Sequence, residues 1–222
     1  MLNYYIIGAG GQARQVASVL YAANPEVKIK AFLDRYDNKG TYYLHNIPVL
    51  SEAILDLAPP GEVMLVNGLG RPNRQKPLER LSSKGFSFLK LIHPQAIIGK
   101  YVTIGEGTVI QSCVQFTTDV TIGKFVLVDL LSTIGHDTIV GDYTTISTGV
   151  NLSGGVNVGK GTWIGTGSVI IEGIKIGDNS VIGAGSVVTH DIGSGKLAYG
   201  APAKEIRDIK DASDTLMKNQ RQ

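Results

Sequence analysis

The amino-acid sequence predicts two structural units, a small parallel α/β domain followed by a long parallel β-helix. Two observations carry this prediction. A six-residue repeat runs without interruption from Ile98 to Gly193. Before it, over about ninety residues, short apolar segments alternate with helical patterns, as in a parallel sheet covered by helices.

The segment before the repeat contains four expected strands, at residues 4–7, 29–33, 63–66 and 88–92, each rich in aliphatic or aromatic side chains. A helix with an apolar face follows the first strand and ends near Asn24. Ser51 is placed to cap a short helix through residue 57, and residues 72–84 are expected to form a longer helix.

A glycine-rich loop joins the first strand to its helix. Gly8, Gly10 and Ala13 have the spacing of a G-x-G-x-x-A dinucleotide fingerprint, and Asp34 ends the next strand about twenty residues on. Such a loop lets backbone N–H groups and a helix N-terminus approach a phosphate, while the carboxylate can hold a ribose or a base. We therefore predict a nucleotide site. NAD is disfavoured because the predicted domain lacks a second mononucleotide-binding half, and a purely structural tight turn is the alternative.

An apolar residue recurs at every sixth position of the repeat, sixteen times in succession. The residue that follows it is glycine at nine of these positions, and a small or β-branched residue often stands four places after it. The apolar positions are Ile98, Ile104, Ile110, Phe116, Ile122, Val128, Ile134, Val140, Ile146, Leu152, Val158, Ile164, Ile170, Ile176, Ile182 and Val188.

A period of six fits neither an α-helix nor a plain two-sided strand. It fits a chain that turns a corner every six residues and points one large side chain inward from each flat face. Three faces make a coil of about eighteen residues, and coils stack at about 4.8 Å through backbone hydrogen bonds. The glycine after each apolar residue suits a corner with positive φ, or a place where tight packing excludes a Cβ.

This repeat resembles that of the hexapeptide-repeat acyltransferases, which form a left-handed β-helix. The resemblance supplies the handedness, since parallel crossovers are otherwise almost always right-handed. It also implies a homotrimer that binds acetyl-CoA between neighbouring prisms, with active sites between subunits. A β-helix that serves only as a scaffold is the alternative interpretation of the repeat.

With the α/β domain included, the chain resembles the bacterial nucleotide-aminosugar N-acetyltransferases and the related sialic acid O-acetyltransferases. The implied division is a Rossmann-like nucleotide-sugar-binding domain at 1–93, a β-helix acetyltransferase domain at 94–209 and a polar tail at 210–222. In the aminosugar enzymes the first domain binds the nucleotide half of a UDP-, dTDP- or GDP-linked sugar. The matching positions here are Gly10, Gly11, Gln12, Asp34, Arg35 and Gly68, and Arg71 and Arg74 match diphosphate contacts loosely.

The same resemblance places the chemistry at His136 and Asp137. Acyl transfer from a thioester needs a base that takes a proton from the attacking amine or hydroxyl, and histidine suits this role near neutral pH. A carboxylate that accepts a hydrogen bond from the imidazole orients the ring and raises its basicity. Asp129 is a further candidate for positioning the substrate. The alternative is that His136 is an exposed edge residue without a function.

A second His-Asp pair, His190 and Asp191, follows 54 residues later, three coils of eighteen, and so lies in the same column. At about 4.8 Å per coil the two imidazoles are roughly 14 Å apart, too far to share a substrate or a metal. We interpret His190 as structural or peripheral. A zinc site like that of β-helical carbonic anhydrases needs three clustered histidines, and the repeat holds only two, so no metal is predicted.

For acetyl-CoA, the resemblance implies contacts on the coils after His136. Gly154, one coil above His136, matches the place of a backbone N–H that stabilises an oxyanion. Thr145 stands where some relatives have a second histidine near the thioester, which puts any step through that imidazole in question. We expect Trp163 and the tyrosines to serve packing. The residues that match positions beside the cofactor are Thr145, Gly154, Thr166, Ala184 and Lys204.

Composition narrows the functional class further. The net charge is +2 and the basic residues are scattered, which argues against nucleic-acid binding. The single Cys113 excludes an intramolecular disulfide framework and fits a reducing compartment. The sequence shows no cleavable signal and no apolar window of about twenty residues. We therefore expect a soluble cytoplasmic protein without membrane insertion.

The sequence thus predicts an acetyl-CoA-dependent N-acetyltransferase that acts on a nucleotide-linked 4-amino sugar in the biosynthesis of a surface glycan, such as lipopolysaccharide or capsule. O-acetylation of sialic acid or another sugar is one alternative. A nucleotide-binding scaffold without catalysis is the alternative of another class. The sugar, the nucleotide base and the use of other acyl donors stay open. Within the tail, residues 211–218 are expected to form a short helix.

Overall fold

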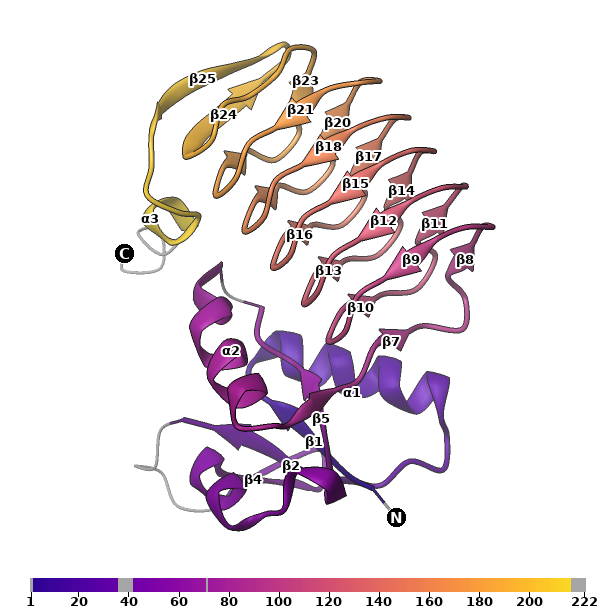
Figure 1. Cartoon of the computed structure of the whole chain (residues 1–222), viewed down its shortest axis with the longest axis vertical. Coiled ribbons are helices and arrows are strands. Elements are labelled where there is room, and N and C mark those ends of the chain that lie inside the picture. Colours follow the sequence, from indigo (N-terminus) through magenta and orange to yellow (C-terminus); the bar gives the residue numbers. More distant parts are fainter. Residues whose placement is uncertain (1, 36–41, 71, 217–222) are drawn as a thin grey trace.

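A computed structural model gives the fold of residues 2–35, 42–70 and 72–216. An α/β domain stands at the first coils of a long triangular prism, and a hairpin with a short helix closes the far end (Figure 1). The predicted architecture, an α/β domain followed by a left-handed parallel β-helix, is confirmed.

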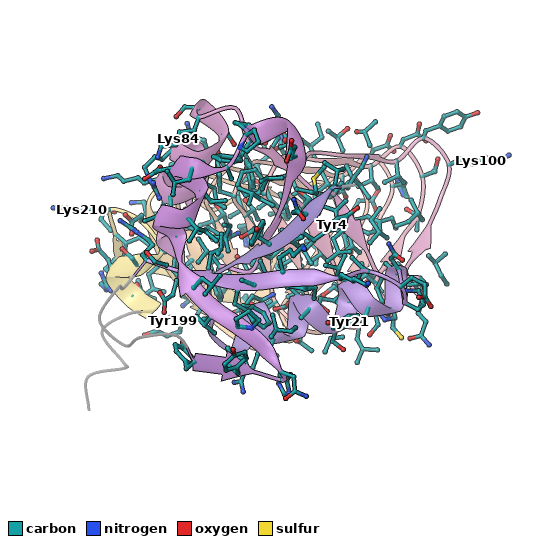
Figure 2. The ribbon with its side chains drawn as sticks, turned by 90° about the horizontal axis from the view of Figure 1, so that it is seen from below. Tyr4, Tyr21, Lys84, Lys100, Tyr199 and Lys210 are labelled. Atoms are coloured by element: carbon teal, nitrogen blue, oxygen red, sulfur yellow. The ribbon has the colours of Figure 1, made fainter. Side chains whose placement is uncertain are left out.

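The N-terminal domain is a six-stranded sheet in the order β3-β4-β2-β1-β5-β6. All neighbours pair in parallel except β3 and β4, which are antiparallel. Helices cover both faces, and Figure 2 shows Tyr21 of α1 and Lys84 after α2 on opposite sides of the sheet. The elements are β1 (Asn3–Ile7), α1 (Gly11–Ala23), β2 (Ile29–Asp34), β3 (Tyr42–Leu44), β4 (Ile47–Ser51), η2 (Glu52–Leu57), η3 (Pro60–Glu62), β5 (Val63–Asn67), η4 (Pro72–Arg74), α2 (Gln75–Ser83) and β6 (Ser87–Phe88).

The β3–β4 hairpin is missing from the sequence prediction, so the sheet has two more strands on this side than expected. Its turn residues His45 and Asn46 have φ of 51° and 65°. Two successive left-handed residues are what a two-residue type I′ turn requires, and asparagine tolerates that conformation. The predicted short helix after Ser51 is a 3₁₀ turn, whose Ala53 N–H donates to Ser51 Oγ at 3.3 Å.

The predicted strand at 88–92 is wrong, because this segment divides between two sheets. Leu89 N–H donates to Leu65 O of the N-terminal sheet at 2.8 Å. Two residues later, Leu91 N–H donates to Thr108 O of the prism at 2.9 Å. The chain therefore passes from one sheet to the other without a linker, and the repeat begins one hexapeptide earlier than the sequence analysis places it.

The prism consists of two-residue strands, each paired in parallel with the strand eighteen residues on, as Val109 pairs with Leu127 and Leu127 with Thr145. Sheet I contains β7, β10, β13, β16, β19 and β22 and ends in β24 and β25, sheet II contains β8 to β23 in steps of three, and sheet III contains β9 to β21. The strands are β7 (Leu91–Ile92), β8 (Ile97–Ile98), β9 (Thr103–Ile104), β10 (Val109–Ile110), β11 (Gln115–Phe116), β12 (Thr121–Ile122), β13 (Leu127–Val128), β14 (Thr133–Ile134), β15 (Ile139–Val140), β16 (Thr145–Ile146), β17 (Asn151–Leu152), β18 (Asn157–Val158), β19 (Trp163–Ile164), β20 (Val169–Ile170), β21 (Lys175–Ile176), β22 (Val181–Ile182), β23 (Val187–Val188), β24 (Lys196–Gly200) and β25 (Ala203–Asp208).

The second residue of each strand points into the prism and forms its core. Ile134, Ile146 and Ile164 are fully buried, and burial of one such side chain contributes about 1.5–3 kcal/mol. Ile98, in the first coil of sheet II, is 37% exposed because no coil lies below it. The interior is therefore an aliphatic ladder that runs the length of the prism, as the period of six predicts.

The corners resolve the two roles that the sequence analysis leaves open for glycine. The left-handed residue lies three places after the apolar residue, at every corner from Tyr101 (φ 60°) to Gly185 (φ 68°), and many of these residues are not glycine. The glycine directly after the apolar residue has no positive φ. At Gly135, a Cβ would lie 2.5 Å from the carbonyl carbon of Ser153 in the next coil. Close stacking of the coils, and not φ, requires glycine at this place.

The outer face of sheet I is covered at both ends. Leu91, Val109 and Leu127 pack in one apolar cluster with the buried face of α1. At the far end, Val181 packs with Ile209 and Ala212 of the segment that leads to α3 (Ser213–Leu216). The predicted short helix of the tail is thus present within the described residues, and residues 217 and 218 lie outside them. The middle of sheet I lies between these two covers.

Alanine substitution tests the two glycine roles. At Gly141, a Cβ would lie 2.5 Å from the backbone N of Lys160, and we expect Gly141→Ala to destabilise the protein by about 3 kcal/mol because neither coil can move away. At Gly149 the Cβ would meet nothing within 4 Å, so Gly149→Ala should cost about 1–2 kcal/mol for its φ of +68° alone. Unfolding midpoints in denaturant give the comparison, and equal losses would contradict the stacking role.

Candidate functional site

A cavity of about 600 Å³ opens at the carboxyl ends of β1, β2 and β5, beside the start of α1. The six positions matched to nucleotide binding all line it, from three separate segments of the chain. The cavity is lined by Ile7, Gly8, Ala9, Gly10, Gly11, Gln12, Leu33, Asp34, Arg35, Gly68, Leu69, Gly70, Arg74 and Pro77. We call it the nucleotide cavity.

The glycine loop shapes this cavity. Gly10 is the N-cap of α1 and its helix has no side-chain cap, so the first N–H groups of the helix remain available to a ligand anion. A Cβ on Gly10 would meet nothing within 4 Å, which leaves room for a ligand beside the backbone. Gly68 has the opposite role, because a Cβ there would lie 2.7 Å from Ile7 O. The loop thus combines an open anion site with tight packing beneath it.

Arg74 lies in the wall of the nucleotide cavity, but its guanidinium points into the protein. The residue is 1% exposed, and Nη2 donates to Tyr143 O at 2.6 Å and Thr144 O at 2.9 Å. Burial lowers the pKa of Arg74 to about 10, although the nearby Asp129 opposes this shift. The loosely matched diphosphate contact is therefore replaced by a structural role, in which Arg74 fastens η4 to the prism. The other loose match, Arg71, lies outside the described residues.

His136 lies at the corner between β14 and β15, where its ring is held on two sides. Nδ1 is 2.8 Å from Asp137 Oδ2, and both side chains are exposed. The ring also lies against the backbone of the next coil, since a Cβ on Gly154 would be 2.5 Å from both Cε1 and Nε2. With Nδ1–H donated to the carboxylate, Nε2 carries the free lone pair and can act as a base.

Gly154 and Asp137 each have a backbone feature that suits this corner. Asp137 is a left-handed residue with φ 56°, a conformation that aspartate tolerates better than most residues. On either side of Gly154, Ser153 N–H donates to Ile170 O and Gly155 N–H to His136 O. Among the described residues, Gly154 N–H donates to no backbone carbonyl. It is thus a donor that the coil ladder leaves unused beside the imidazole.

The second His-Asp pair has a different arrangement. His190 Nδ1 is 3.0 Å from Thr189 Oγ1, and Asp191 Oδ1 instead accepts from Lys175 N–H at 2.8 Å. Asp191 is thereby occupied in coil stacking and does not orient an imidazole. In the chain as described, no group of three or more His, Cys, Asp or Glu side chains could hold a metal ion.

A second groove, of about 380 Å³, lies near the far end of sheet I. Two of the residues matched to the cofactor, Thr166 and Ala184, line it. The other three do not: Thr145 is buried lower on the sheet, Gly154 is at the His136 corner, and Lys204 is exposed on β25. The groove is lined by Ser147, Trp163, Gly165, Thr166, Val181, Ile182, Gly183, Ala184, Leu197, Tyr199 and Thr215. We call it the upper groove.

Trp163 and Tyr199 were expected to serve packing alone, and this is only part of their role. Trp163 packs against the cluster of Val181, Ile209 and Ala212, and both aromatic residues also line the upper groove. The signal that could have found Trp163 is its register, eighteen residues after Thr145 in the outward column of sheet I. Thr215 comes from the tail, whose place on this face no local pattern indicates.

The nucleotide cavity and His136 lie on different sides of the prism. Arg74 in the wall of the cavity contacts Tyr143 and Thr144 just before a sheet I strand, whereas His136 lies at the corner between sheets II and III. Figure 1 shows β14 on the side of the prism away from α2. In Figure 2, Lys100, two coils below His136 in the same column, is at the edge away from Lys210 and Tyr199. One chain therefore assembles the two pockets on one face and presents the histidine at the opposite edge.

Comparisons with known proteins identify relatives of this chain. Residues 155–190 match the family model for the bacterial transferase hexapeptide (six repeats). A curated protein, the UDP-N-acetylbacillosamine N-acetyltransferase of Bacillus subtilis (strain 168), is 33% identical over 116 residues. These residues span 50% of this chain and 52% of that protein, so the match extends over about half of each. None of the helices described here is both long enough and apolar enough to cross a membrane.

Solved structures resemble nearly the whole chain. A mutant of perosamine N-acetyltransferase from Caulobacter crescentus, in complex with CoA and GDP-perosamine, has a TM-score of 0.86 and 31% identity, over 93% of this chain and 97% of that chain. The acetyltransferase domain of PglB from Neisseria gonorrhoeae FA1090 has a TM-score of 0.86 and 28% identity, over 93% and 100%. The same domain in complex with acetyl coenzyme A has a TM-score of 0.84.

Replacement of Arg74 tests its role as a fastener between η4 and the prism. We expect Arg74→Met to lower the free energy of unfolding by about 3 kcal/mol, because it leaves two buried carbonyls without their donor and the Asp129 carboxylate without a nearby positive charge. Lys84→Met is the matched control, since Lys84 pairs with Asp56 at the surface and should leave the unfolding midpoint unchanged. Equal effects of the two variants would contradict this role.

Proposed function

The chain belongs to the hexapeptide-repeat acetyltransferases related to the nucleotide-aminosugar N-acetyltransferases, and on this premise we propose that it transfers the acetyl group of acetyl-CoA to the amino group of a nucleotide-linked amino sugar. The single observation that carries the proposal is the nucleotide cavity, in which six residues matched from sequence come together from three segments. The Caulobacter relative was solved with CoA and GDP-perosamine, which is the same pairing of ligands.

In this proposal, residues 1–93 bind the nucleotide half of the acceptor, which is the nucleotide-linked amino sugar. The diphosphate lies at the N-terminus of α1, where uncapped N–H groups and the helix dipole favour an anion. Asp34 and Arg35, at the end of β2, contact the ribose or the base. Gln12 and Gly68 line the wall between these two regions. The sugar then extends from the cavity along sheet I.

The β-helix at 94–209 supplies the chemistry. The amine nitrogen attacks the thioester carbonyl, and Nε2 of His136 takes the proton that nitrogen loses as the N–C bond forms. Asp137 holds Nδ1–H and so fixes the tautomer and the ring orientation. The Gly154 N–H stabilises the oxyanion. The C–S bond then breaks, and the thiolate of CoA receives the proton from His136.

The separation of His136 from the nucleotide cavity supports a homotrimer as the working form. Acetyl-CoA binds in the upper groove of sheet I, beside Thr166 and Ala184, with Lys204 near its nucleotide end. The histidine at the edge between sheets II and III reaches the sheet I face of a neighbouring copy. Each active site then contains two pockets from one chain and the base from another, so an isolated chain is inactive.

Thiol release from acetyl-CoA tests the proposed function. The acceptors are UDP-, dTDP- and GDP-4-amino sugars, CMP-sialate and free sialate. We expect release with one nucleotide amino sugar and a loss of at least about 100-fold in His136→Ala, because general-base catalysis is worth that much or more. His190→Ala is the matched control and should keep its rate. Release with sialate alone would move the reaction to O-acetylation, and silence with retained nucleotide binding would favour a scaffold.

Alanine at position 154 tests whether the bare backbone of Gly154 lets the His136 imidazole take its working position. We expect Gly154→Ala to lower kcat by about 10-fold or more, since its Cβ would lie 2.5 Å from Cε1 and Nε2 and turn the ring away from its working position. The unfolding midpoint should change little, because the free end of His136 can move. Gly167→Ala, where a Cβ meets nothing within 4 Å, is the control for the rate. A fall in stability with an unchanged kcat would contradict this assignment.

A further inference from the structure

Sheet I carries a short column of polar side chains on its outer face. Gln111, Asp129 and Ser147 each follow an inward-pointing residue and lie eighteen residues apart, so they stack at about 4.8 Å per coil. Val109, Leu127 and, farther up, Trp163 form the apolar column beside them. This polar column lies beside apolar side chains on a face that is covered at both ends. Its presence needs an explanation, because buried polar groups without partners are costly.

Two atoms of this column, and one of Thr145 in the neighbouring column, have no hydrogen-bond partner within the described chain. Gln111 and Thr145 are each 2% exposed, yet Gln111 Nε2 and Thr145 Oγ1 make no hydrogen bond there. Asp129 Oδ1 is buried and equally without a partner. Three such atoms on successive coils of one sheet are unusual in a folded protein, in which nearly all buried polar atoms are paired. Asp129 Oδ1 and Thr145 Oγ1 can accept hydrogen bonds from a donor that comes from elsewhere, whereas Gln111 Nε2 needs an acceptor.

The position of Asp129 indicates which part of a ligand this carboxylate would contact. Ser147, one coil above, lines the upper groove, and Arg74, whose charge acts on Asp129, lines the nucleotide cavity. Asp129 therefore lies between the two pockets, where the acceptor atom of a sugar extended from the cavity would meet the acyl group. Asp129 Oδ1 accepts no hydrogen bond from the described residues, although the charge of Arg74 acts on the carboxylate.

We propose that Asp129, with Thr145, forms the subsite for the acceptor's protonated amino group and selects amine acceptors over hydroxyl acceptors. This inference rests on the proposed function and deepens it. An ammonium group offers three N–H donors and a full positive charge to a buried carboxylate, whereas a hydroxyl offers one neutral donor. Charge-assisted hydrogen bonds in a desolvated place are the stronger ones, so the carboxylate favours the amine.

The subsite also contains a group that can accept the first proton that the ammonium loses. The bound ammonium passes one proton to the Asp129 carboxylate, and the freed lone pair of nitrogen then forms the N–C bond. His136 of a neighbouring copy takes the second proton and returns it to sulfur as the C–S bond breaks, and Asp129 releases its proton to solvent. Burial raises the pKa of Asp129 to about 6, against the attraction of Arg74, which makes its carboxylate a stronger base than an exposed aspartate.

The test compares the full chain with Asp129→Asn, an isosteric change that removes the charge. Isothermal titration without acetyl-CoA measures the Kd of a nucleotide 4-amino sugar and of its 4-hydroxy counterpart. We expect the wild type to bind the amino sugar at least tenfold more tightly. Asp129→Asn should reduce this preference to about twofold or less while the Kd of the hydroxy sugar stays unchanged, and kcat/KM for the amino sugar should fall at least tenfold.

Asp191→Asn is the matched control, because Asp191 is an exposed carboxylate whose acceptor role toward Lys175 N–H asparagine keeps. Parallel weakening of both sugars in Asp129→Asn, or a lowered unfolding midpoint as the only change, would show a structural role and overturn the inference. So would equal binding of the two sugars by the wild type, a result that needs no variant. If the wild type binds neither sugar and releases no thiol with either, the proposed function itself fails.

Discussion

Backbone hydrogen bonds between coils are the constraint on which the rest of this structure depends. Gly135 N–H donates to Leu152 O, and the same bond recurs along each face of the prism. Because the coils stack at one fixed spacing, residues eighteen apart form columns, and a side chain's neighbours are set by counting. His136 therefore lies under Gly154, and Asp129 lies under Ser147. The same stacking excludes a Cβ after most inward-pointing residues, which explains the glycines there.

The columns also explain how the two parts of the chain hold together. The outward residues of sheet I are apolar at the first coils, where α1 packs on Leu127, and at the last coils, where the tail packs on Val181. Around the edge of this sheet, Phe125 stacks on Tyr143 with ring centres 5.3 Å apart, and Phe88 meets Phe125 edge-on. Arg74 adds polar bonds at the same place. The α/β domain is thereby fixed against a particular stretch of the prism.

The three faces of the prism hold the pockets and the hydrogen-bonded histidine apart. Sheet I bears the polar column and the upper groove, and the nucleotide cavity lies in the α/β domain that packs on its first coils. The hydrogen-bonded histidine projects from the edge that sheet I does not share. A single β-helix is too stiff to bend these elements together, because every coil is bonded to the next. In the proposed homotrimer, a neighbouring copy brings its histidine to this face.

The sequence by itself determined the features that are local or periodic. The period of six specified the prism and its core, and the glycine loop with Asp34 specified the nucleotide cavity, because parallel strands bring their carboxyl ends to one edge. The His136-Asp137 dipeptide was recognised by resemblance, and counting in steps of eighteen placed it in one column with His190-Asp191. The β3–β4 hairpin lay within reach of the sequence, since His45 and Asn46 separate two short apolar runs, but its signal was too short to distinguish from a loop.

Only the tertiary structure decided what depends on contacts between distant segments. Arg74 looked like a phosphate ligand from its place after the third predicted strand, and its burial against Tyr143 and Thr144 made it a fastener. The predicted strand at 88–92 divided because two sheets competed for its N–H groups. The sequence offered Asp129 only as a candidate for positioning the substrate, and the partial burial of its carboxylate beside Arg74 appears only in the folded chain. Local pattern carries backbone geometry and register, whereas burial and hydrogen-bond partners arise only once the chain has packed.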